Sequence, residues 1–182
     1  MARVPYKDID DLPEEHRDLL ARPINLHRAL VNSPEAARNF GALGSWIRYG
    51  SRLDPRLREL AILQVGYLAR SPYEYSHHLK IGRDFGVTED DVYALIDETE
   101  GRNSGLPALD RAVLRAAREM TEGLRMSDEC FDLLHDELSD ELIVDLTLII
   151  SFYNAVVRVL GTLEIDVEPD YAPYLEEFPL PR

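Results

Sequence analysis

The residues whose types and spacing could carry out chemistry lie in the segment Ser-Pro-Tyr-Glu-Tyr-Ser-His-His, which begins at Ser71. Glu74 and His78 are four residues apart, so in a helix they share one face, about one turn apart. Glu59 lies in the preceding apolar segment and reaches the same face if two helices pair antiparallel around position 70. A histidine beside a carboxylate exchanges protons near neutral pH, which suits general acid–base catalysis.

The same residues also have structural explanations. Ser71 and Glu74 fit a capping box, with Pro72 at the first helical position. Glu74 and His78 could instead form a surface pair worth a few tenths of a kcal/mol. A metal site is not expected, because no second cluster of His, Cys or carboxylate residues supplies the remaining ligands.

Four arginines concentrate positive charge just before this segment: Arg48, Arg52, Arg56 and Arg58. Because arginine can hold a carboxylate in a bidentate fork, we expect an anionic substrate to be bound here. Arg58 and Arg48 are the candidates for this role, and a solvated helix face explains the other members of the group. Tyr75 and His77, beside the Glu74–His78 pair, are further candidates for contact with substrate.

Composition restricts the classes of function. The 182 residues are 45% hydrophobic and 30% charged, typical of one soluble globular domain, and the net charge is −14. A chain this acidic is repelled by phosphate backbones and anionic membrane surfaces, so we expect neither nucleic acid nor membrane as a partner. The single cysteine, Cys130, forbids an intrachain disulfide and is expected to be a buried structural thiol in a cytoplasmic protein.

Residues that start and stop helices recur along the chain, whereas alternating strand patterns are absent. Helices are predicted over 33–50, 54–70, 71–86, 88–98, 109–121, 127–137 and 139–161. The sequence therefore predicts an all-α fold with a single domain over 1–163. The remaining segment, 164–182, is acidic and rich in proline, which predicts an extended tail. Its rings either anchor it to a neighbouring surface or leave it as a loose terminus.

The segment 141–160 is apolar on nearly every side. Its length could span a bilayer, but Asp145, Asn154 and Arg158 would be costly in hydrocarbon, which favours a buried core helix. A helix that is apolar all round must be covered all round, and a domain this small has few elements to do so. We therefore expect a second subunit to cover part of it.

The segment from Leu53 to Ile96 resembles the core of the carboxymuconolactone decarboxylase/AhpD-like superfamily. The markers are a Leu-Asp…Arg-Glu-Leu helix, then Glu-x-x-x-His with a glycine eight residues after the histidine, then a short acidic helix. The later sequence YNAVVRVLGTLEI is similar to the closing helix of that family. The resemblance implies an AhpD-like orthogonal bundle of about seven or eight helices that assembles as a homo-oligomer, a trimer or hexamer.

This superfamily contains two chemistries. Its peroxidase branch carries Cys-x-x-Cys-x-x-x-His, and the two cysteine positions correspond to Ser71 and Glu74 here. Without a thiolate, reduction of a hydroperoxide by that route is chemically excluded. The decarboxylase branch carries a glutamate and a histidine that match Glu74 and His78. Glu59 matches a glutamate that the peroxidase branch uses in its proton relay.

The sequence thus predicts a cofactor-free acid–base enzyme, a lyase or isomerase acting on a small carboxylated lactone or related enolisable acid. His78 is the expected proton donor, Glu74 the group that orients it, and Glu59 a supporting relay. Two alternatives remain open. One is dehydration, hydration or lactone opening on the same fold, and the other is a non-catalytic oligomeric scaffold.

Overall fold

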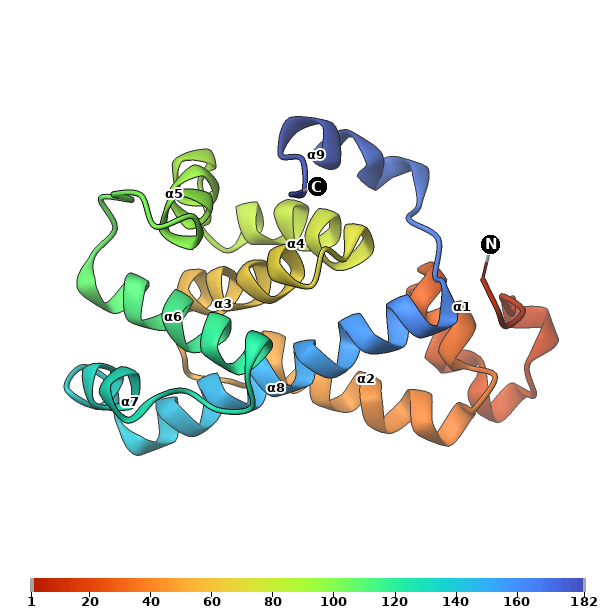
Figure 1. Cartoon of the computed structure of the whole chain (residues 1–182). Helices are drawn as coiled ribbons and strands as arrows, with labels where there is room; N and C mark the ends of the chain where they lie inside the picture. Colours follow the sequence, from red (N-terminus) through yellow and green to blue (C-terminus); the bar gives the residue numbers. More distant parts are fainter. Residues whose placement is uncertain (1, 182) are drawn as a thin grey trace.

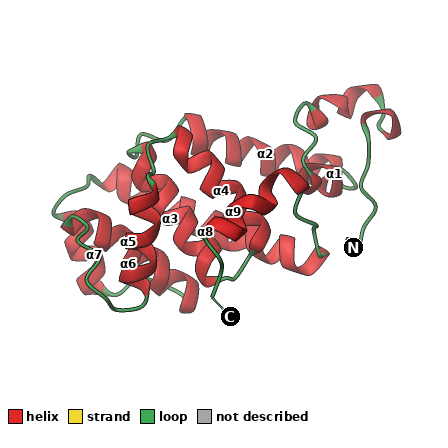
Figure 2. Ribbon diagram, turned by 90° about the horizontal axis from the view of Figure 1, so that it is seen from above, coloured by secondary structure: helices red, strands yellow, loops and turns green. Residues whose placement is uncertain are grey.

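The computed structural model describes residues 2–181. Within that range the chain forms helices and connecting segments but no strand (Figure 2). Seven helices lie where the sequence predicts them: α2 (Pro34–Tyr49), α3 (Pro55–Leu68), α4 (Pro72–Asp84), α5 (Glu89–Thr99), α6 (Ala108–Glu122), α7 (Asp128–His135) and α8 (Asp140–Leu163). The predicted all-α fold is confirmed.

Shorter elements at both ends of the chain were not predicted: η1 (Ile9–Asp11), η2 (Glu14–Leu20), α1 (Asn25–Leu30), η3 (Pro169–Tyr171) and α9 (Ala172–Glu177). Helix α8 also continues past its expected stop at Gly161 to Leu163, and the next residue, Glu164, has a left-handed φ of 52°. One glycine inside a helix costs only about 1 kcal/mol, which the packing of so long a helix offsets.

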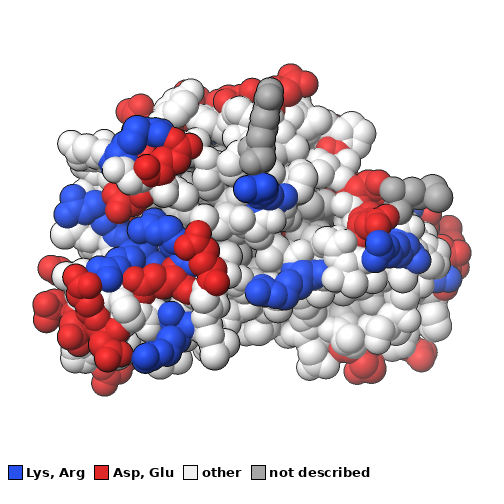
Figure 3. Space-filling view, in the orientation of Figure 1, with Lys and Arg blue, Asp and Glu red and all other residues white. Residues whose placement is uncertain are grey.

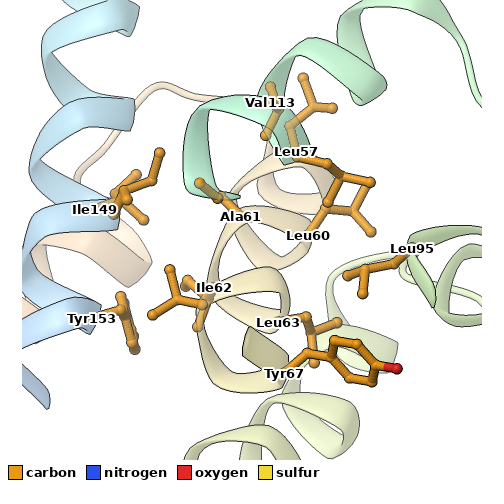
Figure 4. Close-up of a cluster of buried hydrophobic side chains, with 14 of the residues drawn as sticks. Leu57, Leu60, Ala61, Ile62, Leu63, Tyr67, Leu95, Val113, Ile149 and Tyr153 are labelled. Atoms are coloured by element: carbon orange, nitrogen blue, oxygen red, sulfur yellow. The ribbon is translucent and has the colours of Figure 1, made fainter. Parts of the chain in front are cut away.

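Helix α3 is the central element of the bundle. Asp54 caps it by accepting the Leu57 N–H at 3.0 Å, and Pro55 occupies its first turn. Every side chain from Leu57 to Tyr67 is buried. Figure 4 shows the apolar ones among them packed with Leu95 of α5, Val113 of α6, and Ile149 and Tyr153 of α8; the α3 residues labelled there are Leu57, Leu60, Ala61, Ile62, Leu63 and Tyr67. The helix covered on all sides is thus α3 rather than α8.

Close contact between α3 and α4 brings their polar residues together. A Cβ atom at Gly66 would lie 3.2 Å from the backbone nitrogen of Tyr75, so the glycine allows the two backbones to approach closely. The left-handed Arg70 (φ 49°) then reverses the chain between the two helices. This antiparallel hairpin places Glu59 beside His78, as the sequence predicted.

Helix α8 is long and apolar enough to cross a membrane, with a mean hydropathy of 1.8. Its polar residues nevertheless find partners within the bundle. Asp145 accepts from the Ser51 hydroxyl at 2.7 Å, and the Asn154 amide donates to the Thr121 hydroxyl at 3.0 Å. Because these groups are satisfied by neighbouring segments, α8 is best described as a core helix.

One face of α8 lacks a partner within residues 2–181. Val144 and Leu148, one turn apart, are 56% and 43% exposed, and α2 exposes Trp46 and Tyr49. The surface over α2 in Figure 3 carries few charged side chains. Exposed apolar patches of this kind are typical of interfaces between subunits.

These exposed residues agree with the expected homo-oligomer, which stays a prediction because the structure contains a single chain. Light scattering during size-exclusion chromatography at low micromolar concentration should give the mass of a trimer or hexamer. A Val144→Glu and Leu148→Glu double variant should shift that mass downward, because the new carboxylates would be buried without partners in the subunit interface. A wild-type mass near one chain of 20.8 kDa would contradict the prediction.

The tail differs from the extended segment that was predicted. Its prolines Pro169 and Pro173 occupy first-turn positions of η3 and α9, where proline is compatible with helix. Figure 1 shows α9 lying along α4. Tyr171 stacks on His77 with ring centroids 3.5 Å apart, and Phe178 is buried. Of the two alternatives, an anchored tail and a loose terminus, the structure has the first, because the rings hold the tail on the domain.

Glu168 fastens the tail to two helices. One of its oxygens accepts from the Asn25 N–H at 2.6 Å and the Tyr73 hydroxyl at 2.9 Å, while the other lies 2.7 Å from His77 Nε2. Burial alone would raise the pKa of this carboxyl, but the hydrogen bonds outweigh burial and lower it to about 2.

Glu168→Gln should therefore lower the free energy of unfolding by about 1–3 kcal/mol at neutral pH. A lowered carboxyl pKa stabilises the fold above about pH 4.5, and this contribution is lost as pH falls toward 2. The difference between the two proteins should accordingly shrink in acid. Urea unfolding of both proteins at several pH values measures it. A difference that stays constant down to pH 3 would contradict this assignment.

Candidate active site

A cavity of about 290 Å³ lies where α1, α2, α4 and α8 converge. Helix α4 contributes Glu74 and His78 to its wall, α2 contributes Arg48, and α8 contributes Tyr153. The rings of Phe40 and Phe152 and several aliphatic side chains form the rest of the lining. The cavity therefore combines an apolar interior with a few convergent polar groups, as small-molecule sites commonly do.

His78 stands between two carboxylates. Its Nδ1 lies 2.6 Å from Glu59 Oε2, and its Nε2 lies 3.0 Å from Glu74 Oε1. The second pair is not aligned as a hydrogen bond, and Glu74 Oε1 has no hydrogen-bond partner among the described residues. All three side chains are buried. The sequence-predicted trio of Glu59, Glu74 and His78 is thus assembled in one place.

Arg58 extends this cluster away from the cavity. Its Nε donates to Glu59 Oε1 at 3.0 Å, its Nη1 donates to the Arg48 carbonyl at 3.1 Å, and its guanidinium lies 4.4 Å from the centre of the Phe85 ring. The residue is 1% exposed and does not line the cavity. The expectation that Arg58 binds substrate does not fit this position, because Glu59 already occupies its guanidinium.

Positive and negative groups alternate along the cluster in the order Arg58, Glu59, His78 and Glu74, and these charges determine the protonation states of His78 and Glu59. Burial alone would lower the pKa of His78, but the negative charges of Glu59 and Glu74 outweigh it and raise the pKa to about 9. Burial would likewise raise the pKa of Glu59, yet His78 and Arg58 hold it below its usual value. At neutral pH, His78 is therefore an imidazolium and Glu59 a carboxylate.

The start of α4 explains why Glu74 is available to His78. Ser71 caps the helix by accepting the Glu74 N–H at 3.4 Å, but the Ser71 N–H donates to the Gly66 carbonyl at 3.0 Å. The reciprocal half of a capping box is therefore absent. Glu74 turns its carboxylate toward His78 instead. Helix capping therefore explains the presence of Ser71 but not that of Glu74.

Among the four arginines considered, Arg48 lines the cavity. It is half-buried, and its guanidinium makes no ion pair or hydrogen bond with any described residue. Arg52 pairs with Glu141 on the surface, and Arg56 binds two aspartates of α5 and α6. Arg48 is therefore the member of the group that is placed to meet a ligand.

Two other candidates for substrate contact have structural partners. Tyr75 is fully buried against Tyr67, with ring centroids 5.6 Å apart, and does not line the cavity. His77 does line it, but its ring is stacked between Tyr73 and Tyr171 and its Nε2 binds the tail. The side chains of Tyr75 and His77 leave α4 in directions different from that of His78.

Sequence reasoning missed Tyr153. Its ring packs edge-on against His78 with centroids 5.0 Å apart, and burial raises the pKa of its hydroxyl, which the carboxylates of Glu74 and Glu59 raise further. No described residue hydrogen-bonds to this hydroxyl. The signal that could have revealed it is a lone phenol on the apolar helix 141–160, beside an asparagine that was noted only as costly in a membrane.

Cys130 lies in α7, away from the cavity lining. It is buried with its thiol 3.6 Å from the Ala112 carbonyl, and burial raises its pKa to about 11. Cys130→Ala should therefore leave turnover of any substrate unchanged. Thiol-dependent consumption of a hydroperoxide that disappears in this variant would contradict the assignment.

Comparisons with known proteins agree with this architecture. Residues 34–119 match the carboxymuconolactone decarboxylase family. The debrominase Bmp8, solved in complex with 2,3,4-tribromopyrrole, is 20% identical with a TM-score of 0.80, over 97% of each chain. An uncharacterized peroxidase-related protein from Ralstonia eutropha, described as an alkylhydroperoxidase AhpD core, is 19% identical with a TM-score of 0.78, over 96% of this chain and 95% of that one.

A further peroxidase-related protein, from Silicibacter, is 21% identical with a TM-score of 0.72, over 93% of this chain and 92% of its own. The search of curated proteins gave no match. The bundle therefore has the AhpD-like helical fold of these solved structures. Residues 34–119 thus match the carboxymuconolactone decarboxylase family, and the chain has an AhpD-like helical fold. By the sequence resemblance, Ser71 and Glu74 stand at the two cysteine positions of the peroxidase branch.

Proposed function

We propose that the cavity is the active site of an acid–base enzyme that moves a proton at carbon in a small carboxylated lactone or related enolisable acid. The observation that carries the proposal is the setting of His78, whose two ring nitrogens face two buried carboxylates at a cavity wall. A buried ionic cluster is a poor means of joining helices, since apolar side chains would stabilise them as well. Its position in a cavity therefore favours chemistry over a scaffold role.

The distances suggest a role for each group. Glu59 holds His78 through Nδ1 and stabilises the imidazolium, so it acts as the orienting group. The Nε2 proton lies beside Glu74, which lines the cavity. Glu74 thus relays the proton between His78 and the substrate carbon, and the roles of the two glutamates are exchanged relative to the sequence-based expectation.

In a decarboxylation, the bond between the carboxylate and its carbon breaks, CO₂ leaves, and the electron pair remains on the substrate as a dienolate. The proton held between His78 and Glu74 then adds to carbon, and the pair regains a proton from water. In an isomerisation, Glu74 first removes a proton from one carbon, the His78–Glu74 pair exchanges that proton with water, and a proton is then delivered to another carbon. Both reactions use the same relay and need no cofactor.

A panel of small lactones and unsaturated acids tests the proposal. Each compound is incubated with the protein in D₂O and followed by NMR, with His78→Gln as the matched control. We expect deuterium to enter a carbon position, with or without loss of CO₂, in the wild type and not in the variant. Equal turnover by both proteins would contradict it.

A second candidate is the addition or removal of water on the same fold. The free Tyr153 hydroxyl favours it, because its raised pKa keeps the phenol protonated at the cavity wall, where it can donate to a departing hydroxide or lactone oxygen. In the same panel, a product that gains or loses water without loss of CO₂ would identify this reaction. A protein inert toward every compound, whose His78→Gln variant assembles normally, would favour the scaffold alternative.

A further inference from the structure

We infer that Arg22, His27 and Arg48 form an anion subsite of the cavity, which binds the carboxylate of the substrate. The inference rests on the proposed function, because it assigns the charged group of the substrate to the same cavity. The three residues come from the segment before α1, from α1 and from α2, and all three line the cavity. No pattern in the sequence singles out Arg22 or His27 as a binding residue.

The cations of this subsite are unpaired in a strongly acidic protein. The chain carries a net charge of −14, and both the buried Arg58 and the half-buried Arg56 pair with carboxylates. The guanidinium groups of Arg22 and Arg48 make no ion pair or hydrogen bond with any residue from 2 to 181. Arg48 is half-buried and Arg22 is exposed. A half-buried guanidinium such as that of Arg48 is costly without a counter-charge, and an anionic ligand would supply that charge.

His27 completes the subsite. Its Nδ1 donates to the Arg22 carbonyl at 2.8 Å, which fixes the ring and leaves Nε2 without a described partner. Burial lowers the pKa of His27, the hydrogen bond to the Arg22 carbonyl raises it, and electrostatic repulsion from Arg22, Arg48 and the nearby His77 lowers it again. These three groups, on three elements, therefore act on the His27 ring in the same sense. An anion bound among them would reverse that effect and draw a proton onto His27.

The remainder of the cavity indicates what the anion is attached to. The rings of Phe40 and Phe152 lie 4.8 Å apart at the cavity wall. Beside them, α2 presents Gly41 and Gly44. A Cβ atom at Gly41 would meet nothing within 4 Å, and one at Gly44 would meet the Phe152 ring at 3.7 Å. The space beside the rings suits a small flat apolar body, so the ligand class is a small carboxylate with such a body.

Calorimetric titration with benzoate tests the subsite without any turnover, and benzamide serves as the neutral isostere. We expect benzoate to bind the full-length protein more tightly than benzamide does. Arg48→Gln should weaken benzoate binding about tenfold or more, and the more exposed Arg22 should contribute less. Arg111→Gln, an exposed arginine of α6 outside the cavity, is the matched control and should bind benzoate as the wild type does.

Proton uptake provides a readout that a purely structural role would not change. Benzoate affinity should rise as pH falls from about 8 to 6 in the wild type, and this dependence should flatten in His27→Gln. An unchanged dependence in that variant would remove His27 from the subsite.

Three results would overturn the inference: no benzoate binding, equal binding of benzoate and benzamide, or unchanged benzoate affinity in Arg48→Gln. Failure of the proposed function is distinguishable, because His78→Gln should lose turnover and still bind benzoate. Normal turnover in His78→Gln, together with charge-dependent benzoate binding, would support the anion subsite and contradict the acid–base role of His78.

Discussion

His78→Ala is expected to lower the turnover of the substrate by about 10²–10⁴-fold, the usual contribution of a positioned acid–base group. The substitution removes the proton that lies between Glu59 and Glu74 and leaves two buried carboxylates facing each other. One of them should then take up a proton, because like charges in one site raise each other's pKa. Single-turnover kinetics with an identified substrate measure the loss in the chemical step.

The pH profile distinguishes this role from a structural one. With a pKa of about 9, His78 loses its proton as pH rises through that value, so the rate should fall on the alkaline side. Glu59→Gln removes one of the two charges that raise this pKa, so the alkaline limb should move to lower pH. Glu122→Gln, an exposed glutamate of α6, should leave the limb in place. A limb that does not move in Glu59→Gln would contradict the role of Glu59.

The helices could be predicted because their boundaries depend on local chemistry. Asp54-Pro55, Ser71-Pro72 and Thr88 each mark a helix start by satisfying free N–H groups or by fixing φ, whatever the rest of the fold does. Helices α1 and α9 are six residues each and start without a side-chain cap. Their stability comes from the surfaces they pack on, so a local pattern does not reveal them.

The candidate site was predicted in part for the same reason. Glu74 and His78 share a helix face by spacing, and a hairpin brings Glu59 to them. The direction in which the Arg58 side chain points could not be predicted, because it depends on which side of α3 faces the cavity. The segment Leu57–Tyr67 is buried on every side and gives no amphipathic pattern from which that side could be determined.

Tyr153 and Arg22 line the cavity because of the way in which α8 and the segment before α1 pack near α4. These contacts join residues about 50 to 80 positions apart in the chain. No periodicity within either segment encodes them. The cavity wall is therefore a property of tertiary packing, whereas the proton relay is largely a property of one helical hairpin.

Arg58→Met is expected to lower the free energy of unfolding by about 3–5 kcal/mol. Removing one partner of a buried ion pair leaves the other charge uncompensated, and Glu59 is as buried as Arg58 itself. Methionine can still pack on the Phe85 ring, so the loss is chiefly electrostatic. Glu59 should gain affinity for a proton, which moves the acid limb of the activity profile to higher pH. Urea unfolding followed by circular dichroism measures the stability.

A double variant keeps this prediction testable if Arg58→Met alone folds poorly. Glu59→Gln in the same chain removes the uncompensated charge, so the double variant should be more stable than Arg58→Met alone. Arg58→Lys should fall between the wild type and Arg58→Met, because it keeps the charge but does not reach both Glu59 and the Arg48 carbonyl. If Arg58→Met were as stable as the wild type, or if Glu59→Gln destabilised it further by its full single-variant cost, the charge compensation assigned to Arg58 would be wrong.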